Sequence, residues 1–162
     1  MKAMNKTMIR VALLLLAASF VVPAVPAGAA GPFRFHALTP CRIVDTRNPN
    51  GPTGGPVLTH NTSRTFPIQG QCGVPAGAKA VALNVTITQP NGNGYLTLYP
   101  SDAAQPVVST INFILNELAL ANGAIVPLAA SAPDLAVFAA VPFPSGQPGR
   151  VHVILDVTGY FM

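Results

Sequence analysis

Short stretches of alternating apolar and polar residues recur along most of this chain and predict β-strands. In the clearest stretch, residues 78–89, every second position from 81 to 87 is Val, Leu or Ile, and the positions between are small or polar. Residues 150–158 repeat the pattern with Val or Leu at alternate positions. A period of two places successive side chains on opposite faces of a strand. We therefore expect one face of each strand in a core and the Thr- and Asn-rich face outside it.

Turn-forming residues separate these stretches. Residues 48–56 (NPNGPTGGP) and 142–149 (PFPSGQPG) are loops by composition. Residues 91–94 (NGNG) predict a tight hairpin between 78–89 and a return strand, because Asn-Gly readily adopts positive φ angles. Asn122 and Gly123 predict another turn. The other strands are predicted over residues 33–38, 42–46, 63–69, 95–99, 107–113, 124–128 and 135–141.

The number of strands and the lack of a long helical pattern define the expected fold class. Residues 114–121 (ILNELALA) suit a single helical turn but are too few for a stable helix. Eight or nine short strands joined by frequent turns predict an all-β protein, an antiparallel β-sandwich, with a jelly-roll or barrel-like fold as the alternative. We expect residues 31–162 to form this single domain.

The first thirty residues have the layout of a secretion signal. Basic residues precede an apolar stretch over 11–22, which is followed by Pro23, Pro26 and a run of small residues. This order is typical of a signal peptide, and the apolar stretch is shorter than the roughly 20 residues of a membrane helix. We expect cleavage near Ala29 and Ala30, so that residues 1–30 are removed on export. A retained N-terminal anchor is the alternative.

Removal of that segment changes the charge. The chain has nine Lys and Arg against five Asp and Glu, and three of the basic residues lie within 1–30, which leaves six against five. This balance provides no basic patch for nucleic acid. The apolar runs after residue 30 are short and broken by Pro, Gly or Asn, so we expect no membrane span after signal removal. The high hydrophobicity argues against disorder.

The only two cysteines are Cys41 and Cys72. An even number in an exported chain predicts a disulfide, which would stabilise the fold by about 3–4 kcal/mol by closing a loop of roughly 30 residues. Two buried free thiols are the alternative. No spacing typical of a metal site occurs, and we expect neither a metal nor another cofactor.

Charged residues are scarce, and this makes Asp45 and Arg47, beside the loop 48–56, candidates for a ligand site. Arg47 could bind an anionic group there. We favour the alternative, in which the two residues form a network that holds the start of the loop.

A second set of candidates, Asn84, Asn112 and Asp156, is polar and lies in predicted strands. They suit either a sugar- or surface-binding face or cross-strand hydrogen bonds, and we favour the hydrogen bonds. His152 shares a face with Asp156, but four residues of strand separate them by about 13 Å. No serine-hydrolase, zinc-protease or phosphate-loop motif is present.

Several motifs together resemble a functionally uncharacterised family of secreted bacterial β-domains, which occur alone, in tandem or attached to exported hydrolases. The resemblance implies an all-β extracellular module and supplies no catalytic residues. Many members have another residue in place of Cys41, which would make the disulfide a local addition. The motifs are P-x-R-x-x-D-T-R at 40–47, L-N-V-T at 83–86, GYLTLYP at 94–100, S-x-x-N-F at 109–113 and D-V-x-G-Y-F at 156–161.

These observations predict an exported, non-enzymatic module that binds or assembles at the cell surface or in the extracellular matrix. It would be secreted or extracellular, with the periplasm as the alternative compartment, and its partner would be a cell-envelope glycan or a surface protein. One alternative is a small secreted hydrolase acting on glycans, because five acids suffice for a carboxylate pair. Another is a structural subunit that polymerises through its sheet edges.

Overall fold

The structure is a computed structural model that describes residues 31–143 and 146–162, so the predicted signal peptide lies outside the described residues. Nine strands form the described part, which contains no helix and hence none able to cross a membrane. The strands are β1 (Phe35–Asp45), β2 (Leu58–Thr59), β3 (Thr62–Phe66), β4 (Ala80–Thr88), β5 (Gly94–Pro100), β6 (Ile111–Phe113), β7 (Leu120–Pro127), β8 (Leu135–Ala140) and β9 (Arg150–Phe161).

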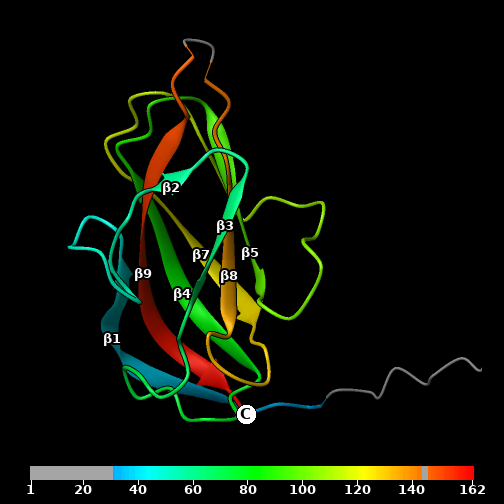
Figure 1. The fold of residues 1–162 in the computed structure, drawn as a ribbon. Coiled ribbons are helices and arrows are strands. Elements are labelled where there is room, and N and C mark those ends of the chain that lie inside the picture. Colours follow the sequence, from blue (N-terminus) through cyan, green and yellow to red (C-terminus); the bar gives the residue numbers. More distant parts are fainter. Residues whose placement is uncertain (1–30, 144–145) are drawn as a thin grey trace, which may run out of the picture. The chain divides into compact units, whose positions relative to one another are not determined.

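The strands form two antiparallel sheets. One has the order β1-β9-β4-β7, with the short β2 paired to the first residues of β9. The other has the order β3-β8-β5-β6. In Figure 1, β9 runs between β1 and β4, and β8 runs between β3 and β5. The sheets do not close into a barrel, which confirms the predicted all-β sandwich.

The core lies between the sheets and consists of the apolar rows that the alternation predicts. Val81, Leu83, Val85 and Ile87 of β4 are all buried, as are the Val and Leu at alternate positions 151–157 of β9. The residues between them on β4 are mostly half-buried on the outer face of the sheet. Burying a Val or Leu side chain contributes about 1.5–3 kcal/mol, so these rows determine which face of each strand turns inward.

The predicted hairpin at residues 91–94 is wrong, because β4 and β5 belong to different sheets. Both edges of β4 are already occupied, one by β7 and the other by β9, so no edge remains for β5. β5 pairs instead with β6 and β8. The positive φ angle in this connection, 55°, belongs to Gln89, and neither Gly92 nor Gly94 has one.

 The 91–94 segment therefore carries the chain from one sheet to the other instead of turning it back within one sheet.

Three further predictions between residues 107 and 124 differ from the structure. The strand predicted over 107–113 is reduced to β6, and its first residues form an exposed loop. No helical turn forms over 114–121, and Asn122–Gly123 lies inside β7 and not in a turn. The edge of β4 that β9 does not occupy offers a full ladder of backbone hydrogen bonds, which outweighs the local turn preference of Asn and Gly.

The two strands predicted over 33–38 and 42–46 are one strand, β1, at the edge of its sheet. Its pairing with β9 shifts register between Ala37 and Cys41 and again between Arg42 and Val44. An edge strand tolerates Pro40, because its outer side needs no ladder hydrogen bond. Cys41 and Cys72 lie at disulfide distance, with Cα atoms 5.8 Å apart, which confirms the predicted pairing and ties this edge to the 70–77 connection.

Candidate functional site

Asp45, the last residue of β1, is the centre of a compact ion-pair cluster. Its carboxylate accepts hydrogen bonds from Nε and Nη2 of Arg47, at 2.9 and 2.6 Å, and from the backbone N–H of Arg47 at 3.1 Å. Nη1 of Arg42 lies 3.7 Å away. The Asp45 side chain is only 6% exposed, whereas that of Arg47 is 43% exposed. The cluster thus has a buried acid and a guanidinium that reaches solvent.

The same residue anchors the loop that follows β1. The backbone N–H of Asp45 donates to the carbonyl of Thr53, and its own carbonyl accepts from the N–H of Asn48. The side-chain hydrogen bonds to Arg47 lower the pKa of Asp45, so the carboxyl is charged at neutral pH. This geometry supports the structural interpretation of Asp45 that the sequence favoured, while leaving part of Arg47 open to solvent.

Thr46, the next residue, links this cluster to β9. Its hydroxyl accepts a hydrogen bond from the backbone N–H of Val153 at 2.9 Å and lies 3.0 Å from Nδ1 of His152. The contact fixes the imidazole on the outer face of the sheet with Nδ1 turned toward Thr46. Burial lowers the pKa of His152, so its ring is neutral at pH 7.

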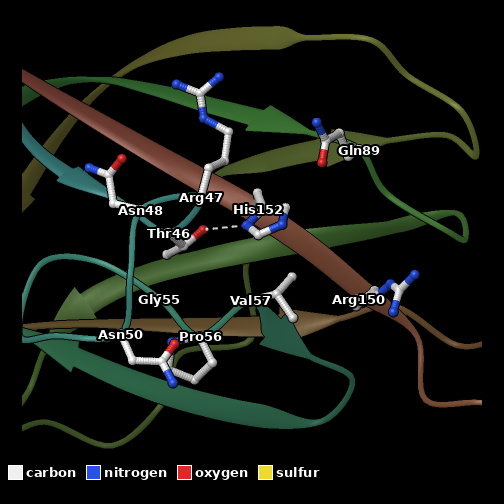
Figure 2. A pocket seen from close by; sticks show the side chains of 10 residues that line it. All are labelled: Thr46, Arg47, Asn48, Asn50, Gly55, Pro56, Val57, Gln89, Arg150 and His152. Carbon is white, nitrogen blue, oxygen red and sulfur yellow. Dashed lines mark hydrogen bonds between the residues drawn. The ribbon is translucent and has the colours of Figure 1, made fainter.

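These residues border a hollow of about 420 Å³ between the loop after β1 and the start of β9. We call it the arginine hollow. Figure 2 shows His152 in its middle, with the guanidinium groups of Arg47 and Arg150 pointing away from each other on opposite sides of the imidazole. The residues that line it are Thr46, Arg47, Asn48, Asn50, Gly55, Pro56, Val57, Gln89, Arg150 and His152.

The lining of the arginine hollow is cationic and rich in amides. It includes two guanidinium groups and three amide side chains but no carboxylate. Arg150 is exposed and forms no ion pair with any carboxylate of the described residues, so its charge is available to a ligand. Guanidinium groups bind carboxylates, phosphates and sulfates through charge-assisted hydrogen bonds, and amides bind hydroxyl groups.

Two of the other predicted site residues, Asn84 and Asp156, lie side by side on neighbouring strands of the same sheet. Asp156 accepts hydrogen bonds from Nε and Nη2 of Arg42 at 2.8 and 3.2 Å, and Asn84 donates to the hydroxyl of Thr86. Both therefore take part in hydrogen bonds on the sheet surface, and neither lines the arginine hollow.

Asn112 lies apart from this group, on β6 of the other sheet. Its amide donates to the hydroxyl of Ser109 at 3.0 Å, beside a separate hollow of about 310 Å³. The structure thus brings Arg42, Asp45, Arg47 and Asp156 together and leaves Asn112 elsewhere.

Sequence reasoning did not assign Arg150 or Gln89 to the site, and it considered His152 only as a partner for Asp156. Arg150 and His152 are separated from Arg47 by about a hundred positions, and only the pairing of β1 with β9 brings them near it. The scarcity of charge was the one available signal for Arg150, which is one of only six basic residues after residue 30.

Two other missed residues have structural roles. The guanidinium of Arg64 lies 4.8 Å from the centre of the Phe66 ring and donates to the carbonyls of Gly54, Gly55 and Pro56, which holds the wall of the arginine hollow. Asp134 is fully buried, and its carboxylate accepts from the backbone N–H groups of Ile68 and Gln69.

No protein family, curated protein or solved structure matches this chain. Among residues 31–143 and 146–162, no group of three or more His, Cys, Asp or Glu side chains is placed to hold a metal ion. The chemistry of the arginine hollow is therefore the basis for the functional argument.

Proposed function

We propose that this protein is an exported, non-enzymatic β-sandwich module that attaches to the cell envelope by binding an anionic group in the arginine hollow. The observation that carries the proposal is the lining of that hollow, which contains amides, no carboxylate and two arginines. Arg150 has no ion-pair partner among the described residues, and Arg47 is paired with the neighbouring Asp45 but remains 43% exposed. The resemblance to secreted bacterial β-domains and the secretion-type first thirty residues support the compartment. A surface protein that displays an acidic group is the alternative partner to an envelope glycan.

The position of the hollow also supports a binding role. It lies against the start of β9 and the loop 46–57, and this loop is held by Asp45 and Arg64 instead of by a ligand. A site that is already ordered loses little conformational entropy when the ligand binds. The loop that carries Arg47 is therefore in place before binding.

Retention on purified cell envelopes tests this function. Arg150→Gln should reduce retention at least several-fold, because it removes an exposed charge without touching the core. Arg34→Gln is the matched control: Arg34 is also exposed but does not line the hollow, and its loss should leave retention unchanged. Equal retention of both variants and the wild type would contradict the proposal.

Export is tested separately by the intact mass of the secreted protein. We expect cleavage near Ala29–Ala30 and a location outside the cytoplasm, either extracellular or periplasmic. A mature protein that still begins at Met1 would refute the signal-peptide prediction without affecting the binding site.

A second candidate function, assembly into a structural array, is favoured by the contrast between the two edges of the β1-β9-β4-β7 sheet. The edge strand β1 carries Pro40, Arg42 and two register shifts, all of which discourage pairing with another strand. The edge strand β7 has no charged residue, and its Ile125 is 66% exposed. A second copy of β7 could pair with it in antiparallel orientation.

Sedimentation velocity over a range of concentrations separates the two candidates. Assembly predicts larger species that Ile125→Lys abolishes, whereas Val107→Lys, a change at an exposed loop residue, should leave them intact. A wild-type protein that remains monomeric at high concentration would exclude assembly through β7.

A further inference from the structure

The arginine hollow continues into two further hollows at the same end of the sandwich. A hollow of about 430 Å³ shares Val57 and Arg150 with it. A third, of about 670 Å³, shares Asn91 and Phe143 with the second and Gln89 with the first. In Figure 1, the connections after β4 and after β6 gather beside the segment that leads into β9. The shared residues make the three hollows one trough.

The chemistry of the trough changes from one end to the other. Arg47, His152 and Arg150 lie in the arginine hollow, whereas Phe143, Leu115 and Leu118 line the third hollow. Amide side chains occur throughout, with Asn48 and Asn50 at one end and Asn91 and Asn116 toward the other. Glu117 is the single acid among the residues that line the three hollows, and it lies at the aromatic end.

We infer that the trough binds a chain of sugars in which an acidic sugar occupies the arginine hollow and a neutral sugar lies against Phe143. This inference rests on the proposed function and specifies its ligand. The two guanidinium groups lie on opposite sides of His152, so they suit a sugar-sized acidic unit between them better than one small ion held by both. Aromatic rings and amides are the side chains that contact sugar rings and their hydroxyls.

Glu117 determines the expected order of charge along the ligand. Its carboxylate would repel a second acidic group at the aromatic end, which favours a neutral sugar there. A polymer that carries a charge on every unit is thus a poorer fit than one in which acidic and neutral sugars alternate.

Hyaluronan fragments of two to eight sugars, which alternate glucuronate with N-acetylglucosamine, are a suitable probe for calorimetry. We expect affinity to rise with fragment length until the trough is filled, and neutral chitin fragments of equal length to bind much more weakly.

Variants of Phe143 test the neutral end of the trough. Phe143→Ala should weaken the binding of the longer fragments roughly 3- to 10-fold and leave the affinity for the disaccharide unchanged. Phe143→Trp, which keeps an aromatic face, should restore binding. Phe33→Ala, a change at an exposed phenylalanine outside the trough, is the control.

The outcomes separate this inference from the proposed function. If Arg150→Gln abolishes envelope retention but affinity does not depend on fragment length, or if Phe143→Ala behaves like Phe33→Ala, the trough inference is refuted and the anion site remains. The same holds if hyaluronan fragments fail to bind a protein that the envelope retains through Arg150. If Arg150→Gln has no effect on retention, the proposed function itself fails.

Discussion

Replacing Asp45 with alanine tests whether the ion-pair cluster holds the fold or serves a ligand. The change removes the acceptor of three hydrogen bonds from Arg47 and leaves the part-buried backbone N–H of Arg47 without its partner. Because Arg47 is 43% exposed, water can solvate the freed guanidinium, and the ion pair itself is worth little. The lost backbone hydrogen bond and the weakened loop anchor should dominate, with a total cost of about 1–3 kcal/mol.

Thermal melting followed by circular dichroism measures this cost. For a domain of this size, a loss of about 2 kcal/mol should lower Tm by roughly 6–10 °C. Asp102→Asn is the matched control, because Asp102 is exposed, and its loss should change stability by less than about 0.5 kcal/mol. An Asp45→Ala protein that melts like the wild type but no longer binds envelopes would refute this reasoning and make Asp45 a ligand-binding residue.

The pH dependence provides a second check on the same residue. Hydrogen bonds from Arg47 lower the pKa of Asp45 in the folded protein. A carboxyl whose folded pKa is lowered contributes stability above its unfolded pKa, near 3.9, and loses it as the pH falls through the folded value. The stability gap between wild type and Asp45→Asn should therefore be constant near pH 7 and shrink below about pH 4. A gap that stays constant down to pH 2 would contradict the ion-pair assignment.

Three further predictions concern Asp134, the disulfide and His152. Asp134→Ala should lower the free energy of unfolding, measured in urea, by about 2–4 kcal/mol, because two backbone N–H groups lose their acceptor. Asp134→Asn should lower it less, because the amide oxygen keeps one acceptor. Replacing Cys41 and Cys72 together with serine should cost about 3–4 kcal/mol by calorimetry, and denatured secreted wild type should contain no free thiol. Affinity for hyaluronan hexasaccharide should rise as the pH falls below 6.5, because burial lowers the pKa of His152 and its ring gains a charge only below that value, and His152→Gln should remove this rise.

The local pattern of the sequence determined the faces of the strands. The alternation in β4 and β9 predicts which side chains are buried, because a strand places successive residues on opposite faces whatever its neighbours are. The class of fold follows from the same information, since many short two-faced strands with few charges can bury their apolar rows only by stacking sheets. The disulfide was also predictable, because the chain contains only two cysteines.

Strand partners, and with them the candidate site, were decided by the tertiary structure. Asn122 and Gly123 have the local preferences of a turn, yet they extend β7 because the open edge of β4 lies beside them. Likewise, Arg47 and Arg150 line one hollow only because β1 pairs with β9 across more than a hundred residues of sequence. Such contacts depend on which edges remain free after the core has formed, and no periodicity within a single strand carries that information.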